Sequence, residues 1–136
     1  MMSDVFNDRS YDRIPELLAD DFVQHGSTPG AELRGQDAWL ENIRQYHDAF
    51  SDLESTEEMA FSDGEYVCSH YTYRGTNDGD FMGIPASNEA VTITGTVITR
   101  IEDHRIAERW VTADILGLLQ QIGSVPAIDE MATFGA

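Results

Sequence analysis

The stretch Ile106–Gly123, IAERWVTADILGLLQQIG, predicts a strand that runs directly into a short helix, with Asp114 at the junction. Side chains alternate along a strand, so Ile106, Trp110 and Asp114 are expected on one face unless a bulge intervenes. A carboxylate desolvated there by apolar neighbours would suit a general base that abstracts a proton from carbon. The alternative, which spacing alone favours, is that Asp114 caps the N-terminus of the helix.

The segment before this stretch predicts a β-hairpin. Val91–Ile101 alternates between the two faces, and Asp103-His104 is expected to form a two-residue turn. That turn would pair Val97 with Trp110 and Ile93 with Asp114. The inner face is then expected to hold Val91, Ile93, Val97, Ile101, Ile106, Trp110 and Asp114. The outer face is expected to hold Thr92, Thr94, Thr96, Ile98, Arg100, Arg109 and Val111, a mixture that indicates a homodimer interface.

Helices are expected before the sheet. Asp12–Ala19 has apolar residues at helical spacing, and residues 20–25 then run extended into a loop, Gly26–Gly35, that is expected to form a pocket rim. A second helix is expected over Gln36–Ala49, where the apolar stripe is typical of a core-facing side. That stripe consists of Trp39, Ile43, Tyr46 and Phe50.

The remaining chain predicts strands. Glu54–Phe61 and Tyr66–Arg74 precede a long glycine-bearing excursion, Gly75–Asn88, in which Phe81 is expected to belong to a pocket lip. Helices followed by a meander of strands predict an α+β fold, with a curved mixed or antiparallel sheet wrapped on the N-terminal helices. A cone of this kind encloses a cavity lined mostly by apolar groups.

The length of the chain predicts a single domain over residues 1–136. Residues 124–136 are expected to form a C-terminal tail. Its apolar residues recur at every third position, so the tail is expected to pack on a neighbour.

The chain has 25 acidic residues against 8 basic ones, all of them arginine, for a formal net charge of −17. Such a charge repels nucleic acid and anionic membranes, so neither is an expected partner. Dispersed acids without lysine indicate a halophilic cytoplasm, where salt screens the self-repulsion.

Several other classes of protein fit poorly. No apolar run approaches the roughly 20 residues that span a bilayer, and the N-terminal MMSDVFNDRS lacks the basic segment and apolar core of a secretory signal. Cys68 is alone, so a cytoplasmic location without an internal disulfide is expected. The four histidines lack the spacing of a metal site, no serine sits in a nucleophile elbow, and no glycine-rich turn opens a helix as in a phosphate site.

Four segments, ELLADDFVQH, AFSDLE, RGTNDGDFMGIPAS and RIAERWVTADILGLLQQIG, follow one another as in SnoaL-like polyketide cyclases. The chain resembles this family, part of the nuclear transport factor two-like superfamily of cone-shaped α+β domains, from Val5 to Gly123. The most specific match is the final strand-helix unit with Trp110, Asp114 and Gly123. The resemblance implies cofactor-free chemistry on a hydrophobic carbonyl compound, in which an aspartate removes a proton and the enolate closes a ring by aldol addition.

By the same resemblance, Asp114 takes the role of the base, and His25 holds a carbonyl oxygen or pairs with Asp114. Trp110 and Trp39 are expected to form walls for a flat substrate. The family often has an arginine where this chain has His70 and a histidine where it has Asn77. Both changes alter the polar groups available to an oxyanion, so a substrate other than a polyketide is one expectation. Substrate contacts are therefore expected from Trp110, Trp39, His70, Tyr46, Asn77 and Phe81.

Three hypotheses follow for the function. The first is an enzyme with Asp114 as the base, catalysing aldol cyclisation, isomerisation or attack of water on an epoxide. The second is a non-catalytic module that binds a hydrophobic small molecule, because one fold serves many functions. The third is an interaction domain whose cone is filled by side chains, which an empty cavity of ligand size would argue against.

Overall fold

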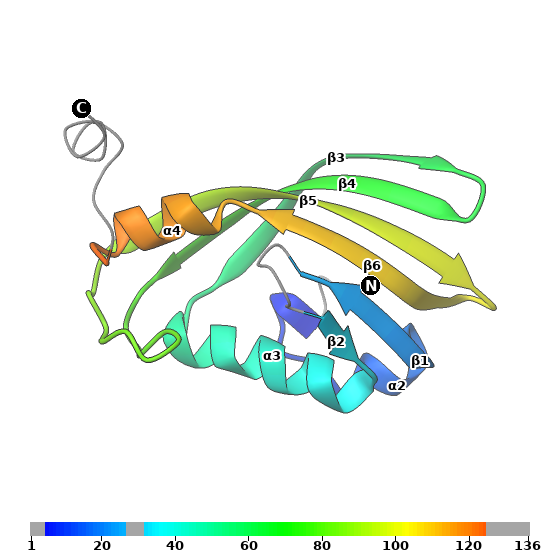
Figure 1. The fold of residues 1–136 in the computed structure, drawn as a ribbon, viewed down its shortest axis with the longest axis horizontal. Coiled ribbons are helices and arrows are strands. Elements are labelled where there is room, and N and C mark those ends of the chain that lie inside the picture. Colours follow the sequence, from blue (N-terminus) through cyan, green and yellow to red (C-terminus); the bar gives the residue numbers. More distant parts are fainter. Residues whose placement is uncertain (1–4, 27–31, 125–136) are drawn as a thin grey trace.

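The computed structural model describes residues 5–26 and 32–124. These residues form a curved six-stranded sheet, with helix α3 lying beneath its concave side and helix α4 at one end (Figure 1). The elements in chain order are η1 (Tyr11–Arg13), α2 (Ile14–Leu17), β1 (Leu18–His25), β2 (Glu32–Arg34), α3 (Gln36–Ala49), β3 (Glu54–Asp63), β4 (Tyr66–Thr76), β5 (Ala90–Glu102), β6 (Arg105–Ala113) and α4 (Ile115–Gln121).

The sheet is mixed and open. Its strand order is β2-β1-β6-β5-β4-β3, and β1 runs parallel to β6 while all other neighbours are antiparallel. The predicted α+β class, a curved mixed sheet packed on helices from the N-terminal half, is confirmed. Because the sheet does not close, its concave side needs the helices to cover it.

Helix α3 supplies that cover. It begins after Gly35, whose φ of 87° suits glycine, and covers the residues predicted for it. Its apolar stripe faces the sheet: Trp39 and Ile43 are each 3% exposed and pack with Phe22 of β1. A second cluster continues the core beyond the end of α3, around Phe50, Leu53, Phe81, Val91 and Leu118.

The first helix differs from the prediction. In place of one helix over Asp12–Ala19, the chain makes the short turns η1 and α2 and is already extended from Leu18. Pro15 lies in the first turn of α2, where its missing N–H costs no helical hydrogen bond. Leu18 is wholly buried and pairs with Ile106 in β6, so tertiary burial in the sheet overrides the local helical pattern there.

The loop predicted over Gly26–Gly35 contains a short strand. Residues Glu32–Arg34 form β2, which pairs antiparallel with Val23–His25 of β1 at the edge of the sheet. The burial pattern of β2 is exposed, half-buried, exposed, so three residues gave little apolar signal for a strand.

The hairpin between β5 and β6 has the predicted turn but a different register. Asp103 and His104 have φ values of 51° and 65°, the left-handed pair required by a type I′ turn. Ile101 pairs with Ile106, in the register that this two-residue turn sets. Ala107 then forms a bulge, because Arg100 pairs with Glu108. Both Ile106 and Ala107 are buried, and every residue after them changes face.

The predicted faces of β6 are therefore wrong beyond the bulge. Trp110 pairs with Ile98 rather than Val97, and Val97 pairs with Val111. Arg109 and Val111, predicted outside, line the concave side, whereas Trp110, predicted inside, lies on the convex outer face. Ile93, predicted to pair with Asp114, does not pair with it.

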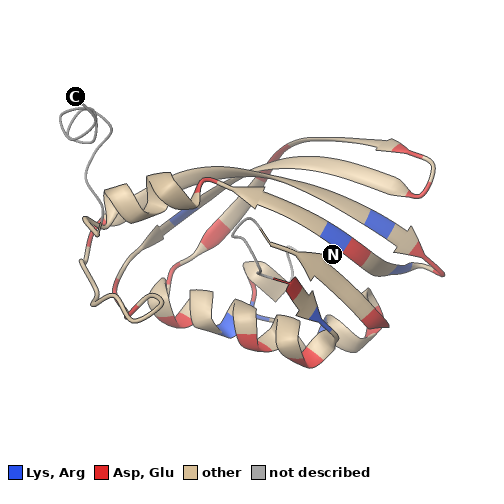
Figure 2. Ribbon diagram, in the orientation of Figure 1, with Lys and Arg blue, Asp and Glu red and all other residues tan. Residues whose placement is uncertain are grey.

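Charge is distributed as the composition indicated. Figure 2 shows acidic residues spread over α3, the strands and the turns rather than gathered in one block. The predicted packing of the tail falls on residues 125–136, which lie outside the described residues.

Candidate functional site

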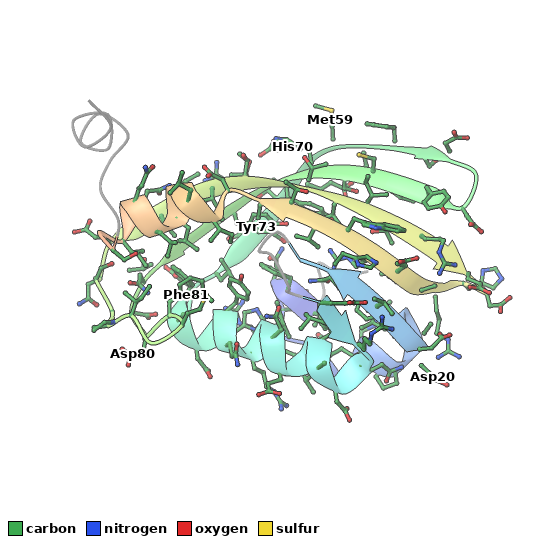
Figure 3. All side chains as sticks on the ribbon, in the orientation of Figure 1. Asp20, Met59, His70, Tyr73, Asp80 and Phe81 are labelled. Carbon is green, nitrogen blue, oxygen red and sulfur yellow. The ribbon has the colours of Figure 1, made fainter. Side chains whose placement is uncertain are left out.

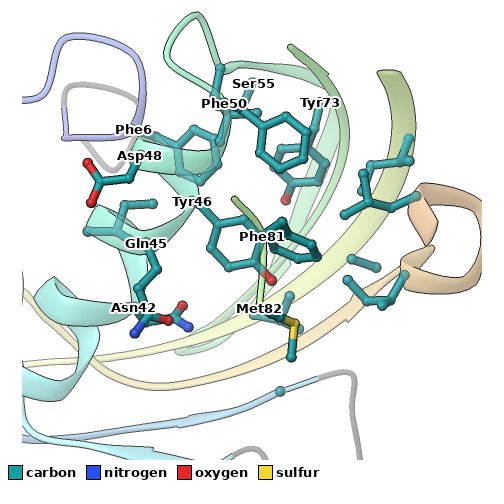
Figure 4. A pocket seen from close by; sticks show the side chains of 18 of the residues that line it. Phe6, Asn42, Gln45, Tyr46, Asp48, Phe50, Ser55, Tyr73, Phe81 and Met82 are labelled. Atoms are coloured by element: carbon teal, nitrogen blue, oxygen red, sulfur yellow. The ribbon is translucent and has the colours of Figure 1, made fainter. Parts of the chain in front are cut away.

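A cavity of about 570 Å³ lies between α3, the concave side of the sheet and the segment 80–83 (Figure 4). Its volume falls within the ~300–1,000 Å³ typical of small-molecule sites. The walls are mainly apolar and aromatic, and they include Trp39, Ile43, Tyr46, Tyr73 and Phe81. The cavity argues against a cone filled by its own side chains.

Phe81 closes one side of this cavity and is held there by neighbouring rings. It is 3% exposed, and its ring centroid lies 5.5 Å from Tyr46 and 5.6 Å from Phe50. Met82 and Gly83 follow it along the rim, and the Met82 side chain is 74% exposed. The predicted lip therefore borders the cavity.

Asn77 positions this segment from outside the cavity. Its side chain is wholly buried; its amide donates to the Gly79 carbonyl at 2.9 Å, and its oxygen accepts from the Ser87 backbone N–H at 2.9 Å. A Cβ at Gly79 would lie 2.0 Å from the Asp48 carbonyl oxygen, so the chain packs onto the end of α3 at a distance that only glycine allows. Asn77 is not among the residues that line the cavity.

A polar group that the sequence did not predict faces the cavity from the sheet. Trp39 Nε1 donates to Gln24 Oε1 at 3.0 Å, and Arg109 Nη1 donates to the same oxygen at 3.3 Å. Arg109 Nε is buried without a hydrogen-bond partner among the described residues. Burial lowers the pKa of Arg109, because desolvation disfavours the charged guanidinium.

Three tyrosines line the same cavity as this guanidinium. Burial raises the pKa of Tyr73 to about 12, and it also raises the pKa of Tyr46 and of Tyr71. Tyr71 donates to Glu57 Oε2 at 3.1 Å, whereas the hydroxyls of Tyr46 and Tyr73 make no hydrogen bond with a described residue and point into the cavity in Figure 4. Because both stay protonated at neutral pH, they are hydrogen-bond donors to a ligand rather than bases.

Asp114 caps helix α4, as the alternative prediction held. Its Oδ1 accepts from the Gly117 backbone N–H at 2.9 Å, and the side chain is exposed. Its neighbours Ala113 and Ile115 line the cavity, but Asp114 does not. The expected desolvation of this carboxylate on the inner face is therefore wrong, and its catalytic role stays a prediction.

His25 and Trp110 lie together on the outer face. Their rings stack with centroids 5.4 Å apart, and His25 Nε2 lies 2.7 Å from Glu108 Oε2. The hydrogen bond from His25 holds the pKa of Glu108 below its usual value. Neither His25 nor Trp110 is among the residues that line the cavity.

His70 is on the outer face as well. Figure 3 shows it beside Met59, on the side of the sheet away from Tyr73 and Phe81. Its Nδ1 lies 3.3 Å from Thr96 Oγ1.

Of the predicted site residues, the cavity thus brings together Trp39, Tyr46 and Phe81. It excludes Asp114, His25, Trp110, His70 and Asn77 from its lining and adds Gln24, Tyr73 and Arg109. The signal for Arg109 was the adjacent apolar pair Ile106-Ala107, which breaks the alternation of the strand and is typical of a bulge.

Two further searches concern only the part of the chain that the structure describes. No three His, Cys, Asp or Glu side chains there are arranged to hold a metal ion. None of its helices is both long and apolar enough to cross a membrane.

Comparison with known proteins identifies the family. The sequence model of the SnoaL-like polyketide cyclases matches residues 1–122. The chain belongs to the SnoaL-like polyketide cyclase family. Membership supports a cofactor-free cyclase role, and proteins of this family bind small-molecule substrates.

Two cyclases are similar to the chain at low sequence identity. Aklanonic acid methyl ester cyclase DauD of Streptomyces sp. (strain C5) is 25% identical over 124 residues, which cover 90% of this chain and 77% of the relative. The DnrD cyclase of the same name from Streptomyces peucetius is also 25% identical, with 90% and 86% covered.

The fold of this chain is closer to that of a solved structure than the sequence identity alone would suggest. The solved structure of wild-type IdmH from Streptomyces antibioticus superposes with a TM-score of 0.79 at 28% identity, covering 90% of this chain and 93% of that one.

Proposed function

We propose that this SnoaL-like protein is a cyclase that closes a ring in a hydrophobic carbonyl compound by intramolecular aldol addition, without a cofactor. The observation that carries the proposal is the cavity of about 570 Å³, whose aromatic walls surround a group of hydrogen-bond donors from Arg109, Tyr46 and Tyr73. Family membership supports the same reaction class.

The reaction needs a proton acceptor and a site that favours negative charge on oxygen. A base removes a proton from a carbon between two carbonyls, the enolate carbon attacks a second carbonyl of the same molecule, and the alkoxide formed takes up a proton. A carbon–carbon bond forms, and the product has the mass of the substrate. Donors fixed around the developing enolate oxygen lower the barrier, and one such donor contributes about 10²–10³ in rate.

Asp114 is our proposed proton acceptor. It matches the family motif, and it lies between two residues that line the cavity, Ala113 and Ile115. Its capping bond to Gly117 leaves one carboxylate oxygen free to accept a proton. His25 has the weaker support, because it stacks on Trp110 at the outer face of the sheet.

The test separates the carboxylate from the cap. Asparagine caps a helix about as well as aspartate, whereas alanine does not. Asp114→Asn should therefore keep the wild-type melting temperature but lose turnover. The compound to assay first is aklanonic acid methyl ester, which appears in the names of the two related cyclases. Asp114→Ala should lose turnover and about 1 kcal/mol of stability. Turnover by Asp114→Asn at the wild-type rate would reject Asp114 as the base.

A non-catalytic binding module is the second candidate. The observation that favours it is that the carboxylates lining the cavity, Asp48 and Asp80, are exposed at its rim, so no buried carboxylate among the described residues faces the ligand. Mass spectrometry after incubation distinguishes the two. A cyclase gives a product of unchanged mass and altered retention, whereas a binding module returns the compound unchanged.

We also propose that two copies pair through the outer face of the sheet. A row of neighbouring side chains crosses five strands there: Phe61, Cys68, Ile98, Trp110 and His25. Phe61 is 65% exposed and Ile98 40% exposed, although both are large and apolar. An apolar centre of this kind is typical of homodimer interfaces.

Sedimentation velocity in molar KCl tests the pairing. The wild type should sediment as a dimer, and Ile98→Glu should be a monomer. Leu116→Glu is the matched control, because Leu116 is 47% exposed on α4 and should leave the dimer intact. A monomeric wild type would refute the interface.

A further inference from the structure

Arg109 differs from the arginines that form ion pairs in this protein. Arg13, Arg34, Arg100 and Arg105 each lie within 3.4 Å of a carboxylate. Arg109 has no carboxylate partner among the described residues, and its hydrogen-bond partner there is the neutral oxygen of Gln24. Its Nε–H is buried, and no described residue accepts a hydrogen bond from it.

Such an arrangement is unfavourable in the free protein. A guanidinium withdrawn from water loses hydration, and a neutral amide restores only part of that interaction. Buried polar groups in proteins are nearly always satisfied, so a cavity-lining guanidinium whose described acceptor is one neutral oxygen can bind a further acceptor placed in that cavity. The side chain is only partly exposed, and the space it faces is the cavity.

The groups around Arg109 indicate which kind of acceptor the cavity binds. Gln24 Oε1 accepts from both Trp39 and Arg109, so the amide is itself held in place and orients the guanidinium. The hydroxyls of Tyr46 and Tyr73 add further donors from the same cavity. A guanidinium surrounded by donors favours an anionic oxygen and disfavours a cationic ligand.

We propose that the ligand of this cavity carries an anionic oxygen, either a carboxylate or an ionised enol or phenol, and that Arg109 binds it directly. The rest of the ligand is apolar and aromatic, since the walls are. This inference rests on the proposed function only in placing the substrate in this cavity; it names the chemical class of that substrate and the residue that selects it.

Isothermal titration calorimetry with matched probes tests the selection. Anthraquinone-2-carboxylate is compared with its neutral methyl ester, and alizarin, with an ionisable phenol, with its methyl ether. The wild type should bind at least one anionic probe tenfold or more tightly than its neutral partner. Which pair shows the preference distinguishes a carboxylate from a phenolate.

The variant Arg109→Met should abolish that preference and leave binding of the neutral probe within threefold of wild type. Arg109→Gln, which keeps a polar side chain, serves as the second variant should the first fail to fold. Arg100→Met is the matched control, because Arg100 pairs with Glu102 and Glu108 on the outer face, and it should keep the preference.

A direct readout is the ¹⁵N–¹H signal of Arg109 Nε, assigned by its loss in Arg109→Gln. It should shift on addition of the anionic probe and not of the neutral one. Equal affinity of the wild type for both members of each pair, or a preference that survives in both Arg109 variants, would overturn the inference.

The experiments distinguish failure of the proposed cyclase function from failure of the proposed anion-binding role of Arg109. Anion preference without turnover would retain Arg109 as the anchor and reject the cyclase. Turnover of a carbonyl compound without a preference for anionic probes would support the cyclase and reject Arg109 as the anion-binding residue.

Discussion

Replacing Arg109 with methionine should make the free protein more stable. The substitution removes a guanidinium that is desolvated on the sheet side of the cavity and lacks a carboxylate partner among the described residues. Burying an ion costs several kcal/mol in proteins after relaxation, and the charged hydrogen bond to Gln24 returns about 1.5–3 kcal/mol. Methionine keeps an apolar stem of similar length in contact with the cavity walls.

The expected net gain is about 1–2 kcal/mol, because the group is partly exposed to the cavity and its penalty is below that of full burial. For a domain of this size, that corresponds to a rise in Tm of roughly 4–8 °C. Urea and thermal unfolding followed by circular dichroism in molar KCl measure it. High salt screens the added repulsion that comes with one more unit of net negative charge.

The matched control is again Arg100→Met, which removes the same charge from a paired position. It should not raise Tm. A decrease in Tm for Arg109→Met, similar to that of the control, would refute the reasoning, because it would mean that the guanidinium stabilises the free fold. Stability gained together with loss of anion binding is the pattern expected of a residue kept for function.

Three further outcomes follow from the structure. Burial lowers the pKa of His47 below its unfolded value of 6.5, so the folded state binds fewer protons than the unfolded state near that pH. The free energy of unfolding should therefore fall as the pH drops through 6.5 to the lowered pKa. In urea titrations His47→Gln should reduce this fall, and His104→Asn, in the exposed turn, should leave it unchanged. Asn77→Ala should cost about 2–3 kcal/mol by removing the buried hydrogen bonds of the 77–88 segment, and an unchanged denaturation midpoint would contradict that role. Tm should rise between low and molar KCl as salt screens the net charge of −17, whereas a flat curve would reject the halophilic interpretation.

The sequence predicted most elements because their patterns are local. The apolar stripe of α3 gave both ends of that helix, and the alternation of β5 and the turn at Asp103-His104 gave the final hairpin. The strand β2 was missed because three exposed or half-buried residues carry no alternation to detect. The N-terminal helix was too long in the prediction because burial of Leu18 in the sheet is a tertiary effect.

The site was harder to predict because one inserted residue, Ala107, determines which side chains of β6 face the cavity. The bulge at Ala107 moves Arg109 into the cavity and Trp110 out of it, and its trace in the sequence is the single apolar pair Ile106-Ala107. The cap at Asp114 was accessible from spacing, since an aspartate directly before a helix is a common N-cap. Trp39 and Tyr46 were found because their helix was placed correctly.

The most direct test of the account is the rate at which the wild type and Arg109→Met cyclise a hydrophobic carbonyl compound at saturating concentration, with aklanonic acid methyl ester, the compound in the names of the two relatives, as the first one assayed. The account predicts a product of unchanged mass from the wild type and a rate at least about 10²-fold lower for the variant, as for loss of one donor to a developing oxyanion. Binding of the compound by the wild type without any cyclised product would contradict it and identify the protein as a binding module.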